Sequence, residues 1–128
     1  WQAGSLLAHL DLSTGSVTRC VIGTGLDQQE AATHPVSGAP IVGATMPHWD
    51  DTLRIACDAH AVFPEFGICG FDIAVTEDGP KVLECNDNPS HNLYQIGAGQ
   101  GLLSPDLAPV WERVTARQAK QLKRLQGK

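Results

Sequence analysis

GFDIAVTEDGPKVLECNDNP, residues 70–89, is the stretch that decides the fold of this chain. Two short runs of apolar residues flank a polar turn, a pattern typical of two antiparallel strands in a hairpin. Three oxygen-bearing side chains, Asp72, Glu84 and Asn86, stand among these apolar residues, where polar groups call for an explanation. We interpret the stretch as a hairpin that carries a candidate site for a divalent metal.

The turn sets which side chains share a face, because a one-residue change of register reverses them. A two-residue loop at Asp78-Gly79 would close with a backbone pair that needs an N–H from Pro80, and proline has none. That loop would also place Asp72 and Glu84 on opposite faces of the hairpin. We therefore do not favour it.

A three-residue loop over residues 77–79 avoids the problem, because it lets Gly79 take the left-handed conformation and pairs Thr76 with Pro80. This register predicts Asp72 directly opposite Glu84, with Cβ atoms roughly 5 Å apart. The same alternation sends three residues to the other face, interpreted as the core side: Ile73, Leu83 and Cys85.

Two carboxylates this close repel one another unless a cation lies between them. Hard cations such as Mg²⁺ or Mn²⁺ take oxygen ligands, and Asn86 offers a further oxygen on the same face as Glu84. We predict Asp72, Glu84 and Asn86 as metal ligands. The alternative is an exposed hairpin whose acids are merely solvated.

Composition bounds the rest of the interpretation. A chain of 128 residues is one small domain, and its apolar runs are too short for a signal peptide or a membrane span. Its four cysteines show no paired CxxC spacing, so we expect reduced, mostly buried thiols in a cytoplasmic protein and no structural zinc. Because the chain begins at Trp1 and not at Met, we expect a processed product or a piece of a longer protein.

Charge is divided unevenly along the chain. Residues 1–112 hold all fourteen acids and only three bases, a balance of −11, whereas the last sixteen residues carry six bases and no acid. An acidic body argues against nucleic acid as the main partner, because phosphate contacts need Lys and Arg. It also predicts that a nucleotide site here would need cationic groups from elsewhere.

Other elements follow from the local pattern. We predict a strand over residues 6–12, a turn over 13–15 and a returning strand over 17–22. Residues 23–40 suggest an extended loop, and Ile41-Val42 a brief strand.

Asp50 or Asp51 is the expected N-cap of a helix that runs to about Phe63, with Pro64 ending it. One face of this helix is predicted to hold Leu53, Ala56, Cys57 and His60. We interpret His60 as a packed or surface histidine and not as a ligand.

The C-terminal part combines a glycine cluster with a basic helix. Residues 97–101 are interpreted as a flexible connection, since no Gly-Lys-Ser/Thr ending marks a phosphate loop. From about Pro105 a helix is predicted, with an incomplete apolar stripe that includes Trp111. Its basic face holds Arg113, Arg117, Lys120 and Arg124. We favour a terminal helix that docks by its apolar side over one that binds a membrane surface. The predicted fold class is α+β, a mainly antiparallel sheet flanked by helices, with residues 1–103 as one lobe and 104–128 as the basic helix.

Several of these motifs resemble the C-terminal, metal-binding end of the ATP-grasp superfamily. The likeness rests on Phe71-Asp72-Ile73-Ala74-Val75, on Leu83-Glu84-Cys85-Asn86 and on the following Asn88-Pro89. Upstream, His34-Pro35-x-x-Gly38-Ala39-Pro40 and Pro47-His48-Trp49-Asp50 are similar to the sugar-transfer-associated ATP-grasp proteins. The resemblance runs from about Gly4 to Gln95.

The resemblance implies ATP and Mg²⁺ as cofactors, with Asp72, Glu84 and Asn86 as metal ligands. It also implies that Leu83 packs near the adenine and that the loop holding Asn88 and His91 borders the acceptor or the phosphates.

The chain departs from the family at two positions and lacks the family's first lobe. Gly70 stands where some ATP-grasp ligases have arginine, and Ser90 where a glycine is common. The lysines of the first lobe, which such enzymes use to cup ATP, would precede Trp1.

Two functions of different classes therefore stay open. The first is the Mg²⁺-binding portion of an enzyme that activates a carboxylate with ATP as an acyl phosphate and joins it to an amine or another nucleophile, with a small carboxylate or sugar-linked substrate. The second is a truncated, non-catalytic module that binds a divalent metal, a carbohydrate or a partner protein. A metal-dependent hydrolase is a weaker third, because no histidine is well spaced from the acidic pair.

Overall fold

The computed structural model describes residues 4–127, so the first three residues of the expected lobe and the last residue of the expected basic helix lie outside it. The α+β class is confirmed, and the strands form two separate antiparallel sheets. One sheet has the order β1-β2-β3, formed by β1 (Leu6–Leu10), β2 (Val17–Ile22) and β3 (Gln29–Glu30). The other is a hairpin of β4 (Gly70–Thr76) and β5 (Gly79–Asn86).

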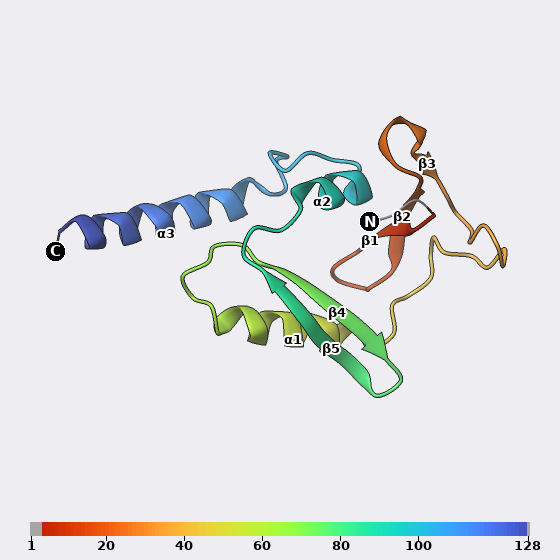
Figure 1. Ribbon diagram of the computed structural model, residues 1–128, viewed down its shortest axis with the longest axis horizontal. Coiled ribbons are helices and arrows are strands. Elements are labelled where there is room, and N and C mark those ends of the chain that lie inside the picture. Colours follow the sequence, from red (N-terminus) through yellow and green to blue (C-terminus); the bar gives the residue numbers. More distant parts are fainter. Residues whose placement is uncertain (1–3, 128) are drawn as a thin grey trace.

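Each sheet has its own helix (Figure 1). Helix α1 (Trp49–Ala61) packs against both strands of the hairpin, and α2 (His91–Ala98) packs against β1 and β2. The long helix α3 (Ala108–Gln126) projects away from both layers and carries the C-terminal end of the chain. The predicted C-terminal helix is thus present and starts at Ala108.

The predicted pairing of the first two strands is confirmed, with Leu6 opposite Ile22 and Ala8 opposite Cys20. The first strand ends at Leu10, two residues before the predicted end, because Asp11 already belongs to the turn. One carboxylate oxygen of Asp11 accepts hydrogen bonds from the backbone N–H and the hydroxyl groups of Ser13 and Thr14, at 2.6 to 3.0 Å. These bonds lower the pKa of Asp11.

The long loop predicted for residues 23–40 is only partly correct. It contains the short 3-10 helix η1 (Gly25–Asp27) and the edge strand β3, and Thr33 pairs with Pro40 in an isolated bridge. The brief strand predicted at Ile41-Val42 is wrong. The backbone N–H groups of both residues donate to the carbonyl of Ala32 and close a local turn.

The start of α1 also differs from the prediction. The helix begins at Trp49, and its N-cap is His48, which takes a left-handed conformation with φ 54°. The indole N–H of Trp49 donates to the carbonyl of Leu12 at 3.0 Å, and its side chain lies so close to Gly15 that a Cβ there would clash. This anchor fixes where the helix begins, and Asp50 and Asp51 fall in the first turn, where carboxylates favour the helix dipole.

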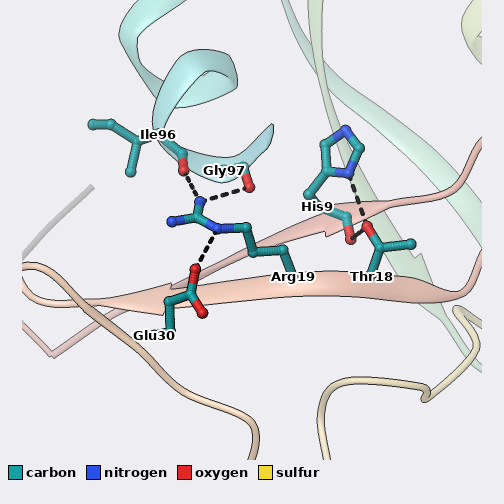
Figure 2. A network of polar contacts seen from close by, with 6 residues as sticks. All are labelled: His9, Thr18, Arg19, Glu30, Ile96 and Gly97. Carbon is teal, nitrogen blue, oxygen red and sulfur yellow. Dashed lines mark hydrogen bonds and ion pairs between the residues drawn. The ribbon is translucent and has the colours of Figure 1, made fainter. Parts of the chain in front are cut away.

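The glycine cluster is not the flexible connection that the sequence suggested. Gly97 is buried within α2 next to Leu7, and Gly99 ends the helix in the left-handed conformation with φ 67°. Arg19 on β2 reaches this end of α2 and donates to the carbonyls of Ile96 and Gly97, as Figure 2 shows. A cation at a helix C-terminus interacts favourably with the unpaired carbonyl groups.

The core of the described chain is small. Cys20 and Val21 are its only fully buried hydrophobic side chains within residues 4–127, and most other apolar residues are half-buried. Burial raises the pKa of the Cys20 thiol. All four cysteines are free, as expected, but the expectation that they are mostly buried is wrong for Cys57 and Cys85, which are exposed. With so little buried area, single polar anchors contribute a larger share of stability.

We expect Arg19→Ala to lower the free energy of unfolding by roughly 1.5–3 kcal/mol, because two carbonyls at the end of α2 lose a charged donor. Urea unfolding followed by circular dichroism measures the change. Glu30→Gln is the matched control. Glu30 forms an ion pair with Arg19 at 2.9 Å, but its side chain is 74% exposed, so we expect the pair to contribute less than about 1 kcal/mol. Equal losses in the two variants would contradict the role assigned to the carbonyl contacts.

Asp11→Asn tests the turn through its pH dependence. The folded pKa of Asp11 is lowered, so its carboxylate stabilises the fold above its unfolded pKa of about 3.9, and the contribution is lost as pH falls through the folded pKa. We expect the wild type to unfold at higher urea concentration than Asp11→Asn at pH 7, with the two midpoints converging in acid. If the difference between the two urea midpoints does not change with pH, the charge of Asp11 does not contribute to the stability of the turn.

Candidate metal site

The hairpin places the three predicted ligands as the sequence indicated. Asp72 on β4 lies directly opposite Glu84 on β5, and Asn86 lies opposite Gly70. Directly opposed residues in an antiparallel pair have Cβ atoms about 4.5–5.5 Å apart, within the reach of one bound cation. Because side chains alternate along a strand, Asn86 shares the face of Glu84.

The turn that produces this register differs from the predicted one. Thr76 pairs with Gly79 and Val75 with Pro80, so the loop has two residues and the predicted pairing of Thr76 with Pro80 is wrong. Gly79 does adopt a positive φ of 106°, and its carbonyl accepts a hydrogen bond from the Thr76 hydroxyl at 2.8 Å. Pro80 then occupies the next pair along, where no ladder hydrogen bond is needed because hydrogen-bonded and free pairs alternate.

A β-bulge restores the opposition of the two carboxylates. The register shifts by one residue between Asp72 and Ile73, where Leu83 on β5 is left without a partner. Without this extra residue, Asp72 would face Leu83. The two-residue loop and the bulge together give the same alignment near Asp72 as the predicted three-residue loop.

The two faces of the hairpin have different surroundings. Phe71 belongs to the face that α1 covers, because its ring lies 6.4 Å from that of His60 on α1. His60 is a packed histidine, as predicted, and its Nε2 lies 3.1 Å from the carbonyl of Phe66. Asp72 and Glu84 belong to the opposite face and are exposed, together with Lys81.

The chemistry of the acidic face suits a hard cation. Within residues 4–127, the side chains of Asp72, Glu84 and Asn86 make no ion pair or hydrogen bond, so their oxygens are free to bind a ligand. All three are oxygen donors, the type that Mg²⁺ and Mn²⁺ prefer. In the same part of the chain, His, Cys, Asp and Glu do not gather in groups of three or more that could hold a metal, so the site would depend on the two carboxylates and the amide of Asn86.

Of the three other predicted site residues, Asn88 and His91 line the same cavity and Leu83 does not. This cavity has a volume of about 300 Å³ and lies between the loop after β5, the loop before β4 and the first turns of α3. Leu83 lies at the bulge and is 71% exposed, so its expected place on the core side is wrong. Cys85 is also exposed, although the register puts it on the face of Phe71.

The cavity brings in residues that sequence reasoning did not assign to a site. Trp111 and Arg117 enter from α3, and Glu65 enters from the loop after α1. The sequence did mark Arg117 as part of a basic face and Trp111 as part of an apolar stripe. It gave no signal that α3 starts beside the Asn88 loop, because that proximity comes from the path of the chain through α2.

Gly70 stands where some ATP-grasp ligases have arginine, and the structure gives a steric reason for a glycine here. A Cβ at this position would lie 2.6 Å from the Cβ of Pro89, in a ring that cannot rotate away. The close approach holds the loop of Asn88 over the start of β4. A longer side chain at position 70 would therefore displace the loop that lines the cavity.

Comparison with known families agrees with this geometry. The family model of the sugar-transfer associated ATP-grasp proteins matches residues 1–109, which includes the whole hairpin and the cavity loop of Asn88. The chain therefore belongs to the sugar-transfer associated ATP-grasp family. No curated protein and no solved structure shows a significant match to it.

No helix in residues 4–127 combines the length and the apolar character that crossing a membrane requires. The longest helix, α3, carries the basic residues of the C-terminal segment.

We expect Gly70→Ala to lower the free energy of unfolding by roughly 1–3 kcal/mol, because the added methyl group overpacks against Pro89. Urea unfolding measures the loss. Gly101→Ala is the matched control, since a Cβ there would meet one atom of Gln95 at an ordinary 3.8 Å. If both variants are equally stable, Pro89 moves freely and the loop is not held by this contact.

Proposed function

We propose that this chain provides the Mg²⁺-binding hairpin of an ATP-dependent, ligase-type enzyme, with Asp72, Glu84 and Asn86 as ligands. The observation that carries the proposal is the opposition of Asp72 and Glu84 on the uncovered face of the hairpin, both without a partner within residues 4–127. Membership of the ATP-grasp family supports ATP as the nucleotide. A bound Mg²⁺ would neutralise charge on the phosphates of ATP.

The residues of the hairpin would act by binding and orientation. Asp72 and Glu84 project from neighbouring strands whose spacing is fixed by the ladder, so their carboxylates stay within reach of one cation. Asn86 is half-buried at the end of β5 and adds a neutral oxygen next to the loop of Asn88. Substrate held in the cavity beyond this loop would lie at the end of the strands that carry the acids.

The cationic half of the nucleotide site is proposed to come from a separate lobe. The first 112 residues have a balance of −11, and Lys81 is the basic residue that the hairpin presents on its acidic face. A triphosphate needs more positive charge than this lysine and one divalent ion supply. We therefore propose residues 1–103 as the metal-binding lobe and 104–128 as a basic helix attached to it.

The proposed reaction is the formation of an acyl phosphate from a carboxylate and ATP, followed by attack of an amine or another nucleophile. It is supported by the family and by the metal ligands, and a sugar-linked substrate is supported by the family's description. A cytoplasmic location fits the proposed use of ATP, and it also fits a chain whose four cysteines form no disulfide. The alternative is a non-catalytic module. It would use the same acidic pair to bind a metal but would not turn over ATP.

We expect Asp72→Asn and Glu84→Gln each to weaken Mn²⁺ or Mg²⁺ binding to the 128-residue chain by at least about tenfold, because each removes one of two charged ligands. Isothermal titration calorimetry measures the loss. Asp78→Asn, at the tip of the same hairpin, is the matched control and should bind metal as the wild type does. Equal binding by all variants would refute the ligand assignment.

In a protein that joins this chain to the proposed cationic lobe, the same two substitutions should lower ATP-dependent turnover by roughly a hundredfold or more while leaving the unfolding midpoint unchanged. Metal binding without any turnover in the wild-type form of that protein would support the non-catalytic module instead. Tight binding of ATP to the 128-residue chain alone would contradict the need for a second lobe.

A further inference from the structure

Two cavities lie next to each other where α3 meets the body of the protein. The first, of about 300 Å³ and called the polar cavity below, has polar and apolar lining in nearly equal amounts, and its polar walls are Glu65, Asp87, Asn88, Arg117, Gln118 and Gln121. The second, of about 290 Å³, is mostly apolar, and its apolar walls are Ile68, Cys69, Tyr94, Leu102, Leu107 and Val110. Four residues belong to both cavities: Ile68, Pro89, His91 and Trp111.

From this arrangement we propose that the double cavity binds an amphipathic small molecule, with an uncharged, hydroxyl-rich head in the polar cavity and an alkyl or acyl chain in the apolar one. Each cavity alone is at the small end of ligand sites, and the pair joins a surface rich in polar side chains to one that is mainly apolar. If the proposed function holds, this molecule is its acceptor. That last step rests on the proposed function, whereas the binding itself does not.

The polar lining favours an uncharged head. Arg117 brings one positive charge, and Glu65 and Asp87 bring two negative ones, so the net charge of −1 disfavours a phosphate head. Because both signs of charge line the cavity, neither forms a concentrated field for a charged head. Amide side chains such as Gln118 and Gln121 both donate and accept hydrogen bonds, which suits hydroxyl groups.

The shared wall is held in place by its own contacts. The indole N–H of Trp111 donates to the carbonyl of Leu102, and the ring of His91 meets that of Trp111 edge-on at a centroid distance of 6.4 Å. Val114 packs so closely on Gly67 that a Cβ there would lie 2.5 Å from a methyl carbon of Val114. These contacts fix the first turns of α3 against the loop before β4, so the cavities are built into the fold.

The position of the double cavity ties it to the acidic hairpin. Asp87 and Asn88 follow Asn86 directly in sequence, so the polar cavity begins where β5 ends. A head group bound there would lie at the same end of the hairpin as the predicted metal ligands, and its alkyl chain would point along α3 and α2.

Cys69 provides a direct measure of occupancy, because its thiol is free and lines the apolar cavity. We would follow alkylation of the 128-residue chain by N-ethylmaleimide at mildly alkaline pH, with octyl glucoside as the probe below its micelle-forming concentration. Cys57, on α1 and exposed, is the internal control. At a probe concentration about twice its Kd, we expect Cys69 to react roughly threefold more slowly and Cys57 at its original rate, by mass action.

Head-group and chain requirements are tested in the same assay. Glucose alone and octanol alone should protect Cys69 less than octyl glucoside, and octyl phosphate should protect it less because of Glu65 and Asp87. The double variant Gln118→Ala/Gln121→Ala should lower protection by octyl glucoside to the level of octanol. Gln126→Ala, on the same helix beyond the cavity, should leave it unchanged.

Several results would overturn the proposal: no protection of Cys69, equal slowing of Cys57, equal protection by octanol alone, or equal protection by octyl phosphate. Asp72→Asn separates this inference from the proposed function. That variant should keep the protection of Cys69 while losing metal binding, so protection that disappears in it would refute an independent site. If octyl glucoside protects Cys69 but the wild type binds no metal, the cavity proposal stands and the assignment of the metal ligands is refuted.

Discussion

The pairing of β4 with β5 is the constraint on which the rest of the site depends. Its ladder sets the distance between Asp72 and Glu84, and its bulge at Leu83 sets their alignment. Because α1 covers one face of the hairpin, Asp72 and Glu84 are left exposed on the other face. A hairpin of two strands is marginal by itself, so the packing of α1 is also what keeps the register in place.

Outside the hairpin, the fold relies on a few specific contacts more than on a large core. Arg19 ties the end of α2 to β2, and Trp49 ties the start of α1 to the turn that Asp11 organises. Gly15 allows the close approach of Trp49, and Gly99 leaves room for the guanidinium of Arg19, which a Cβ would meet at 3.3 Å. Such polar and steric anchors restrict the arrangement of elements even where few side chains are fully buried.

The loop of Asn88 connects the acidic hairpin to the double cavity, because it follows β5 directly and lines the polar cavity. Family membership assigns the chain to the sugar-transfer associated ATP-grasp proteins, and the structure supplies the geometry that such a membership leaves open. The acidic pair is suited to a cation, and the cavity at the first turns of α3 is suited to an organic ligand. Their proximity follows from the short loop of Asn88 that connects β5 to α2.

The hairpin and the opposition of Asp72 and Glu84 could be predicted from the sequence, because strand alternation and turn residues act over short distances along the chain. The family could be predicted as well, because its motifs are short runs of neighbouring residues. The sequence predicted the right opposition through the wrong turn, since a bulge leaves almost no sequence signal. The exposure of Leu83, the helix that contains Gly97 and the meeting of Trp111 with the Asn88 loop were decided only by the tertiary structure. These features depend on which distant surfaces pack together, and local patterns do not encode that choice.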